Sequence, residues 1–383
     1  MFIKFKFLLF MLFLINLVLG SGCSDNKTIF DRALLSAGNT SLLKKVMLKA
    51  EKGERIVVGL IGGSITQGAK ASHMSKSYAY QAAIWWEENF PNADIGFVNA
   101  GIGSTGSDIG VFRLNRHLLR FKPDIVIVEF SVNDSNTEKS AETLEGIIRQ
   151  SFNRSDPPAI ILLMMCNAKN EKELVSAQKW HSKIGYHYNL PMISLKGALS
   201  SGFQSGNLKA DKIFADGLHP NDFGHKLVAD LVCSFFKRVK NELKGPQKQL
   251  LQELPRPLIS KRFDHTDFFQ PGDINPFLNK GWRVGPVRRF RSAWESGISG
   301  SEIGFEVEGA EISLLYDRDQ NAGIVEVFVD DLPPQKINAS TSSYPSPSVT
   351  KILSRQKSEK HKIVIKSIDG NSFKLIAFMT AFD

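Results

Sequence analysis

Cysteine is scarce in this chain of 383 residues, which has only three. Three cysteines cannot build the disulfide framework of small secreted domains, so a conventional apolar core must stabilise the fold. Cys166 and Cys233 lie in apolar surroundings and are interpreted as buried thiols. No histidine or cysteine cluster has metal-ligand spacing, and His181 and His187 are interpreted as surface or packing residues. We therefore expect neither a metal ion nor a cofactor.

A concentrated basic surface is also lacking, although basic residues outnumber acidic ones. The chain has 48 Lys and Arg against 39 Asp and Glu, a formal charge of +9. Local clusters occur at Arg288-Arg289-Arg291 and at 357–362, without interleaved aromatic residues. Proteins that bind nucleic acid gather their basic residues on one face. We therefore expect no nucleic-acid partner and assign these clusters to solvated surface.

Long apolar runs are missing except near the N-terminus. Lys4 and Lys6 precede an apolar run at 7–19, and small residues follow up to Cys23. This order of charged, apolar and small residues is typical of a secretory signal, and the run is too short for a comfortable membrane span. We therefore expect residues 1–22 to be a signal peptide and the protein to be exported.

Cys23 resembles the lipidated cysteine of bacterial lipoproteins, because small residues precede it and a polar stretch at 24–27 follows like a tether. The resemblance implies an acyl anchor on Cys23. Such an anchor would hold the protein on a membrane surface of the bacterial cell envelope, in the periplasm or on the outer side. Ordinary signal cleavage nearby, with Cys23 incidental, is the alternative.

From about residue 28 to 244, strand-like and helix-like segments alternate. Alternating strands and helices predict a parallel sheet with helices on both faces, an α/β fold of three layers. The expected strands are 56–61, 94–99, 124–130, 159–165 and 190–194, and the expected helices are 76–89, 107–121, 138–153, 171–188 and one from about 221.

Composition changes near residue 245, where prolines become frequent and period-two segments follow. We expect an α/β domain at 23–245, a linker or crossing at 246–276, and an all-β sandwich, jelly-roll-like, at 277–383. Apolar residues in the crossing, such as Leu258 and Phe263, need burial. This favours a docked second domain over a freely tethered one.

The stretch Gly62-Gly63-Ser64-Ile65-Thr66 follows the first expected strand. Its two glycines allow a tight turn, and open α/β sheets bind ligands at the carboxyl ends of their strands. Ser64 is therefore either a nucleophile or simply the N-cap of the next helix. A nucleophilic serine needs a base, a group that orients the base, and donors for an oxyanion.

Candidates for these partners occur downstream. Asp216 and His219 lie three residues apart, so both side chains can project from one turn towards Ser64. The loop at 99–104 is rich in small residues, which let backbone N–H groups approach a substrate, and the stretch 131–134 contains an asparagine amide. Together these groups have the chemistry of a serine hydrolase.

Two other interpretations remain open. The loop from Gly101 to Gly106 fits a dinucleotide-binding fingerprint, with Glu129 downstream near a strand end. That fingerprint normally follows the first strand of its unit, whereas a strand and a helix precede it here. A non-catalytic polysaccharide-binding lipoprotein is the second alternative, and the intact set of catalytic candidates argues against it.

Four short blocks of sequence follow one another along the chain, at 62–66, 99–104, 132–134 and 216–220. Through these blocks, in this order, residues 55–240 resemble the SGNH (GDSL-like) hydrolases. The resemblance implies a flavodoxin-like sheet order, with Ser64 as nucleophile, His219 as base and Asp216 as the carboxylate that orients it.

The same resemblance implies an oxyanion hole. Its donors would be the N–H of the nucleophile Ser64, the N–H of Gly103 or Ser104, and the side-chain amide of Asn133. Gly63 stands where the family usually has aspartate.

The expected protein is an exported serine esterase that acts through an acyl-enzyme on Ser64. Resemblance, export and the added β-domain together favour small acyl groups, above all acetyl, on a carbohydrate or polysaccharide. A lipase or acylhydrolase acting on lipid esters is the alternative. The sequence does not determine the oligomeric state.

Overall fold

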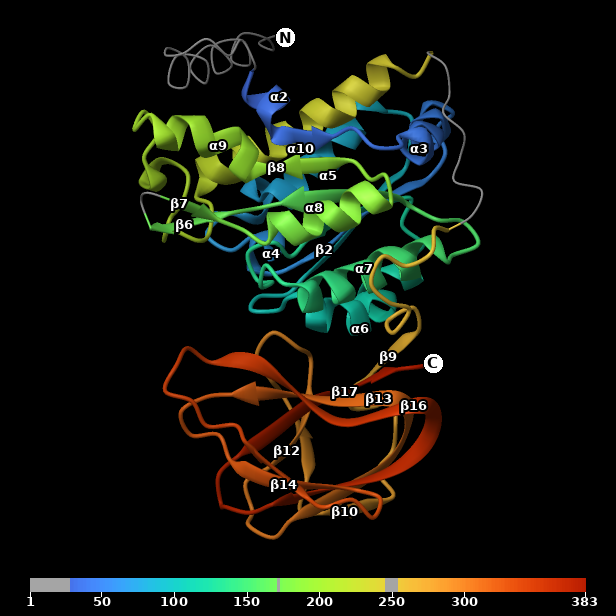
Figure 1. The fold of residues 1–383 in the computed structure, drawn as a ribbon, viewed down its shortest axis with the longest axis vertical. Helices are drawn as coiled ribbons and strands as arrows, with labels where there is room; N and C mark the ends of the chain where they lie inside the picture. Colours follow the sequence, from blue (N-terminus) through green and yellow to red (C-terminus); the bar gives the residue numbers. More distant parts are fainter. Residues whose placement is uncertain (1–27, 171–172, 245–253) are drawn as a thin grey trace, which may run out of the picture.

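The structure is a computed structural model that describes residues 28–170, 173–244 and 254–383. The expected signal peptide, the lipidation candidate Cys23 and part of the expected crossing lie outside the described residues. An α/β part and an all-β part are stacked along the long axis of the molecule (Figure 1). Among the described helices, none has the length and apolarity needed to cross a membrane.

Six strands form the sheet of the α/β part: β1 (Leu34–Ser36), β2 (Ile56–Gly62), β3 (Ile95–Gly101), β4 (Ile125–Glu129), β5 (Ala159–Met164) and β8 (Met192–Ser194). Their order is β1-β8-β5-β4-β2-β3. Only β1 is antiparallel to its neighbour, and the other pairs are parallel. The strand order reverses between β2 and β4, which is where open α/β sheets bind their ligands.

Helices cover both faces of this sheet. One face carries α6 (Ser107–His117), α7 (Glu138–Phe152) and α8 (Gln178–His187), and the other carries α2 (Ile29–Ala33), α3 (Ser41–Glu51), α5 (Tyr78–Asn89), α9 (Leu195–Gln204) and α10 (Asp222–Asn241). Alternate residues of β4 enter two separate apolar cores, Val126 and Val128 on the first face and Ile125 and Ile127 on the second. The predicted three-layer α/β/α fold with flavodoxin-like strand order is confirmed.

The helix predicted at 171–188 is wrong at 173–177, because α8 begins only at Gln178, and residues 171–172 lie outside the described residues. Before α8, β6 (Asn167–Asn170) pairs antiparallel with β7 (Glu173–Val175). The backbone N–H of Ala168 in β6 donates a hydrogen bond of 2.7 Å to the carbonyl of Gly217. A tertiary contact of this kind overrides local helix preference and is invisible in a short window of sequence.

Nine antiparallel strands form the C-terminal part: β9 (Thr266–Phe269), β10 (Leu278–Lys280), β11 (Arg283–Gly285), β12 (Ala293–Ser296), β13 (Glu302–Arg318), β14 (Ile324–Val329), β15 (Gln335–Asn338), β16 (Ser346–Ser367) and β17 (Phe373–Ala381). Their order is β11-β12-β17-β13-β16-β14-β15, with β10 beside β13 and β9 beside β17. The pairing of β13 with β16 is interrupted by register shifts near Gly309, which let the long strands bend around an apolar core. The predicted all-β sandwich is confirmed, and β9 lies within the range 246–276 that was assigned to the crossing.

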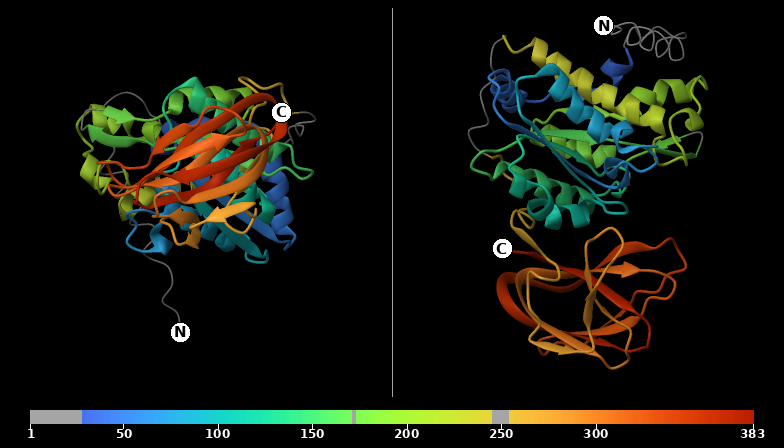
Figure 2. Two further views of the ribbon diagram at one scale, coloured as in Figure 1. Left: turned by 90° about the horizontal axis from the view of Figure 1, so that it is seen from below. Right: turned by 180° about the vertical axis from the view of Figure 1, so that it is seen from behind.

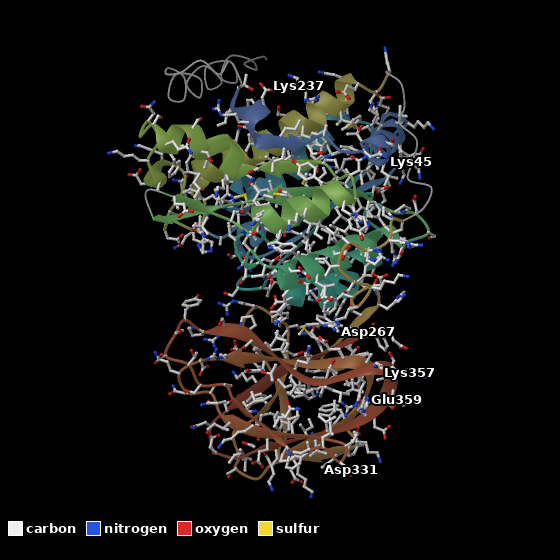
Figure 3. The ribbon with its side chains drawn as sticks, viewed as in Figure 1. Lys45, Lys237, Asp267, Asp331, Lys357 and Glu359 are labelled. Atoms are coloured by element: carbon white, nitrogen blue, oxygen red, sulfur yellow. The ribbon has the colours of Figure 1, made fainter. Side chains whose placement is uncertain are left out.

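The β-part docks on the face of the α/β part that carries α6 and α7 (Figure 1 and Figure 2). One buried apolar cluster runs through the junction and includes Phe112 of α6, Ile147 of α7, Phe268 of β9, and Leu315 and Met379 of the β-part. Figure 3 shows Asp267 of β9 at the same junction. The two parts therefore share a continuous core.

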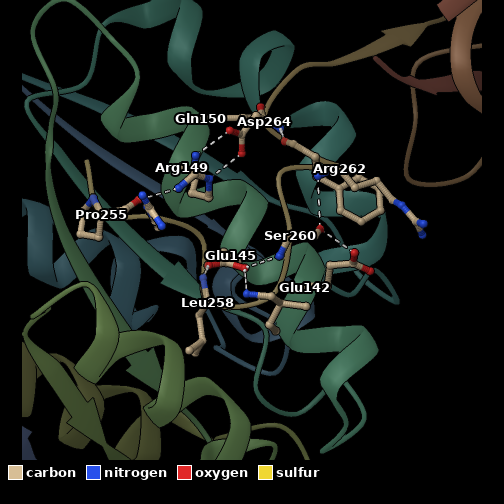
Figure 4. Close-up of polar contacts among 12 residues, drawn as sticks. Glu142, Glu145, Arg149, Gln150, Pro255, Leu258, Ser260, Arg262 and Asp264 are labelled. Carbon is tan, nitrogen blue, oxygen red and sulfur yellow. Dashed lines mark hydrogen bonds and ion pairs between the residues drawn. The ribbon is translucent and has the colours of Figure 1, made fainter. Parts of the chain in front are cut away.

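The crossing at 254–264 is fastened to α7 by polar side chains (Figure 4). The Glu145 carboxylate accepts hydrogen bonds from the N–H groups of Leu258, Ile259 and Ser260, at 2.5, 2.9 and 3.2 Å. Arg149 forms two bonds of 2.7 Å to the carboxylate of Asp264. This segment is thus an ordered connection and not a loose tether.

Candidate active site

Ser64 is the first residue of the short helix α4 (Ser64–Gln67), directly after β2. Gly63 is the N-cap of this helix, so the interpretation of Ser64 as an N-cap is wrong. The hydroxyl oxygen of Ser64 lies 2.8 Å from Nε2 of His219. A serine within hydrogen-bond reach of an imidazole has the geometry of an activated nucleophile.

Asp216 and His219 meet on the turn before α10. Nδ1 of His219 lies 2.9 Å from Oδ2 of Asp216. Oδ1 of Asp216 accepts the N–H groups of Leu218 and His219, at 3.1 and 2.8 Å. Burial alone would raise the pKa of Asp216, but these hydrogen bonds outweigh it and lower the pKa to about 2. The carboxylate is therefore charged at neutral pH and can hold Nδ1–H, which leaves Nε2 to face Ser64.

Local sequence explains why this turn forms. Gly217 has a φ of +76°, a conformation that glycine adopts without a steric penalty. The N–H of Ala215 donates to the carbonyl of His219 at 2.8 Å and closes the turn. Asn221 caps α10, since its side chain accepts the N–H of Gly224 at 2.9 Å. His219 is thus held between a closed turn and a helix cap.

Asn133 follows β4 on the other side of the switch point, and its side chain lies against Gly63. A Cβ atom on Gly63 would lie 2.2 Å from Oδ1 of Asn133, far inside van der Waals contact. Only glycine allows this approach, which gives a physical reason for its presence here. The role of Asn133 as a donor to an oxyanion stays a prediction.

Gly103 and Ser104 lie in the loop between β3 and α6. A Cβ atom on Gly103 would be 3.6 Å from Cβ of Ser64, so this loop lies beside Ser64. The Gly103 N–H donates to Oε1 of Gln67 at 3.0 Å. Ser104 has a φ of +60°, which is uncommon for a residue with a side chain. Which of the two N–H groups meets an oxyanion stays a prediction.

Comparison with known proteins gives this geometry a family. The model of the GDSL-like lipase/acylhydrolase family matches residues 60–227, a range that includes all four blocks. A solved two-domain esterase active on acetylated mannans, co-crystallised with mannopentaose, is 31% identical, with a TM-score of 0.82 over 92% of this chain and 98% of that chain. The chain belongs to the GDSL-like lipase/acylhydrolase family. The domain that carries Ser64 is, by family, a carboxylic ester hydrolase domain.

Two further matches agree with this membership. A second structure of a two-domain esterase active on acetylated mannans gives a TM-score of 0.84 at 31% identity, over 92% of this chain and 98% of that chain. The acetylxylan esterase of Xylanibacter ruminicola is 24% identical over 247 residues, which are 54% of this chain and 48% of that protein. The chain therefore spans about half the length of the acetylxylan esterase.

A residue of the β-part also lies beside the loop that flanks Ser64, and sequence analysis missed it. Nε of Arg289 would lie 3.7 Å from a Cβ atom on Gly103. The guanidinium donates to the carbonyl of Pro345 at 3.1 Å and lies over the ring of Tyr344, 5.6 Å from its centre. The only signal in the sequence was the Arg288-Arg289-Arg291 cluster, which does not reveal what it contacts. The structure places Arg289 against the loop of the α/β part and not in the predicted solvated surface.

The structure does not support the dinucleotide-binding interpretation. Glu129, which would have to reach a ribose, is fully buried. Burial and the nearby charge of Asp134 raise the pKa of Glu129 to about 8. The loop that matches the fingerprint contacts α4, since a Cβ atom on Gly101 would lie 2.3 Å from the backbone nitrogen of Gln67. The acidic residue that the fingerprint assigns to a ribose is therefore inaccessible to a nucleotide.

The remaining predicted residues have structural surroundings. Cys166 is buried and Cys233 is half-buried, both as free thiols, and burial raises the pKa of each to about 12. His181 is buried, with Nε2 at 3.0 Å from a carboxylate oxygen of Asp134. His187 is half-buried and lies 2.8 Å from the carbonyl of Arg256. Across the described ranges, no group of three His, Cys, Asp or Glu side chains could hold a metal ion.

Proposed function

We propose that this protein is an exported serine esterase that removes small acyl groups, above all acetyl groups, from a polysaccharide. The observation that carries the proposal is the hydrogen-bonded series Ser64–His219–Asp216 at the switch point of the sheet. Similarity over nearly the whole chain to an esterase active on acetylated mannans supports the substrate class. The partial similarity to an acetylxylan esterase agrees with it.

In the proposed first step, Nε2 of His219 takes the proton of Ser64 as its Oγ attacks the acetyl carbonyl carbon. The carbonyl electron pair moves to oxygen, and this oxyanion is met by the Ser64 N–H, one loop N–H and the Asn133 amide. When the intermediate collapses, the sugar oxygen leaves with the proton from His219, and the acetyl group stays on Ser64. Asp216 stabilises the imidazolium that exists between these transfers.

In the proposed second step, water replaces the sugar as the reactant. His219 accepts a proton from the water molecule while its oxygen attacks the acetyl-serine carbonyl, and the same donors stabilise the second oxyanion. Collapse breaks the bond to Ser64 Oγ, which recovers its proton from His219. Acetate leaves and the enzyme is restored.

Acetate release from a panel of acetylated mannan, acetylated xylan and a triacylglycerol emulsion tests this proposal. We expect release from at least one of the polysaccharides. Ser64→Ala and His219→Ala should each lose about 10⁴-fold in turnover while keeping the wild-type circular dichroism spectrum. Ser343→Ala, in an exposed turn, is the matched serine control and should match the wild type.

Two results would contradict the proposal. Wild-type turnover in Ser64→Ala would remove the nucleophile from Ser64. Hydrolysis confined to the triacylglycerol would replace the carbohydrate assignment with that of a lipase.

We further propose that Cys23 carries an acyl anchor. The support is the order of residues around it: an apolar run, small residues, the cysteine and a polar stretch. Cys23→Ala should then move the protein from the membrane fraction to the soluble fraction of cells. Equal membrane retention of the variant would contradict lipidation at this position.

A further inference from the structure

Arg113 on α6 is a buried cation to which the proposed mechanism assigns no role. Its side chain is 0% exposed. Burial lowers the pKa of Arg113 to about 9, so the guanidinium remains charged at neutral pH. Within the described part of the chain, no carboxylate forms an ion pair with it. Proteins rarely bury a charge without a partner of opposite sign, because its desolvation is then uncompensated.

The guanidinium instead donates to three neutral acceptors around the nucleophile. Nη1 lies 2.6 Å from the carbonyl of Ala100, at the end of β3. Nη2 lies 2.9 Å from the carbonyl of Gly62, at the end of β2, and 3.3 Å from the hydroxyl of Thr105. Arg113 therefore links the strand that leads into Ser64 to both ends of the loop that carries the candidate N–H donors.

This link lies directly behind the place where the oxyanion is expected. Gly62 is two residues before Ser64. A Cβ atom on Gly63 would lie 3.3 Å from the carbonyl of Thr105 and 2.2 Å from Oδ1 of Asn133. The acceptors of Arg113 and the candidate donors thus belong to the same few residues of backbone. A charge at this depth is weakly screened, because little water surrounds it.

We propose that Arg113 is a positioning residue of the oxyanion hole that also supplies its positive potential. Its hydrogen bonds hold the loop in the position in which an N–H faces Ser64. Its positive charge, which no carboxylate neutralises, stabilises the oxyanion of the transition state. The proposal rests on the serine-esterase function proposed above. Because that anion exists only during the reaction, the contribution of Arg113 belongs to kcat and not to KM.

Arg149 offers a matched control. It is also a buried arginine, 4% exposed, but its guanidinium is paired with Asp264 on the side of the crossing. It also donates to the carbonyl of Pro255 at 2.9 Å. Removing either arginine costs hydrogen bonds in the interior, yet only Arg113 contacts the backbone around Ser64.

The experiment compares Arg113→Gln, Arg113→Lys and Arg149→Gln in the full-length protein. For each, kcat and KM are measured on p-nitrophenyl acetate, and Ki is measured for phenylboronic acid, which forms an anionic tetrahedral adduct with an active serine. Arg113→Gln should lower kcat about 10- to 100-fold and raise Ki by a similar factor, with KM within about 2-fold of the wild type. Arg113→Lys keeps the charge but loses the guanidinium fork that joins the two strand ends, so its kcat should lie between that of Arg113→Gln and the wild type, about 3- to 10-fold below that of Arg149→Lys. Arg149→Gln should lower the midpoint of thermal unfolding without changing kcat or Ki.

The outcomes separate this inference from the proposed function. Turnover that survives in Ser64→Ala defeats the proposed function itself. If Ser64→Ala is inactive but folded Arg113→Gln keeps kcat and Ki within about 2-fold of the wild type, the inference about Arg113 is overturned. Should Arg113→Gln fail to fold, Arg113→Lys decides in the same way, with Arg149→Lys as its control: an equal kcat in the two lysine variants overturns the inference.

Discussion

At the scale of single residues, the turn that carries Ser64 depends on the absence of a side chain at Gly63. Gly63 precedes Ser64 and lies against the amide of Asn133, which comes from the neighbouring strand. This contact joins the block at 62–66 to the block at 132–134, and it is possible because Gly63 has no Cβ atom. The turn and the candidate oxyanion donor therefore cannot vary independently.

Gly63→Ala should displace the Asn133 amide, because the new Cβ atom would lie 2.2 Å from its oxygen. Loss of one oxyanion donor lowers kcat by about 10²–10³, and we expect a loss up to this size with KM largely unchanged. Steady-state kinetics on p-nitrophenyl acetate measure it. Gly370→Ala is the matched control, since a Cβ atom there meets nothing within 4 Å. An unchanged kcat in Gly63→Ala would show that catalysis does not require the Asn133 amide at its present position.

Glu129 makes stability depend on pH. Its pKa is raised from 4.5 to about 8 by burial, with a further contribution from Asp134. Between these values the native state keeps a proton that the unfolded state loses, so the free energy of unfolding falls as pH rises, by up to about 1.4 kcal/mol per pH unit. Glu129→Gln lacks this titration. Its thermal midpoint should fall less than that of the wild type between pH 5 and pH 8, and parallel curves would contradict the assignment.

How much of the site the sequence predicts depends on how far apart in the sequence the contacting residues are. That Ser64, His219 and Asp216 come together could be predicted, because Ser64 follows a strand of a parallel sheet, and Asp216 and His219 lie three residues apart in a block whose resemblance to a family places it beside that serine. The bond from Gly103 to Gln67 joins residues 36 apart, and the bond from Arg113 to Gly62 joins residues 51 apart. No local pattern encodes such pairs, so Gln67, Arg113 and Arg289 were missed.

At the scale of elements, the crossing between the two parts is organised by one helix. Three consecutive N–H groups of the crossing converge on the buried carboxylate of Glu145 in α7. The sequence indicated that this segment needed burial, from its apolar residues. It could not show the polar anchor, because Glu145 and its partners are more than 100 residues apart, with separations of 113 to 115.

Glu145→Ala should destabilise the protein, because it leaves three half-buried N–H groups and the buried Tyr188 hydroxyl without their acceptor. A buried group without a partner costs about 1–3 kcal/mol and water can meet the half-buried ones, so we expect a loss of about 1–3 kcal/mol in the free energy of unfolding. Urea denaturation followed by tryptophan fluorescence measures this loss. Glu308→Ala, at an exposed position of β13, should stay within about 0.5 kcal/mol of the wild type. Equal stability of the two variants would mean that Glu145 does not anchor the crossing.

At the scale of the whole molecule, the two parts behave as one folded unit because their cores merge. Phe112 of α6 and Met379 of β17 belong to the same buried cluster, and both are at most 5% exposed. The alternation of strand-like and helix-like segments predicted the α/β architecture, and the period-two segments predicted the all-β architecture. The interface was inferred only from apolar residues in the crossing, since no pattern in either part shows which faces meet.

A chain that ends at residue 244 should therefore be poorly soluble or much less stable. Removing the β-part would expose the apolar faces of α6 and α7 to water, which promotes aggregation. Size-exclusion chromatography and thermal unfolding measure the effect. A soluble, monomeric product with full activity on small esters and on polymer would contradict the docked arrangement.

Labelling by a fluorophosphonate tests the central claim most directly, because such reagents react covalently with a serine only when it is activated as a nucleophile. Peptide mass spectrometry then locates the modified residue. The account predicts one modification, on Ser64, with no labelling in Ser64→Ala and much slower labelling in His219→Ala. Modification of another serine, or equal labelling of Ser64→Ala, would contradict it.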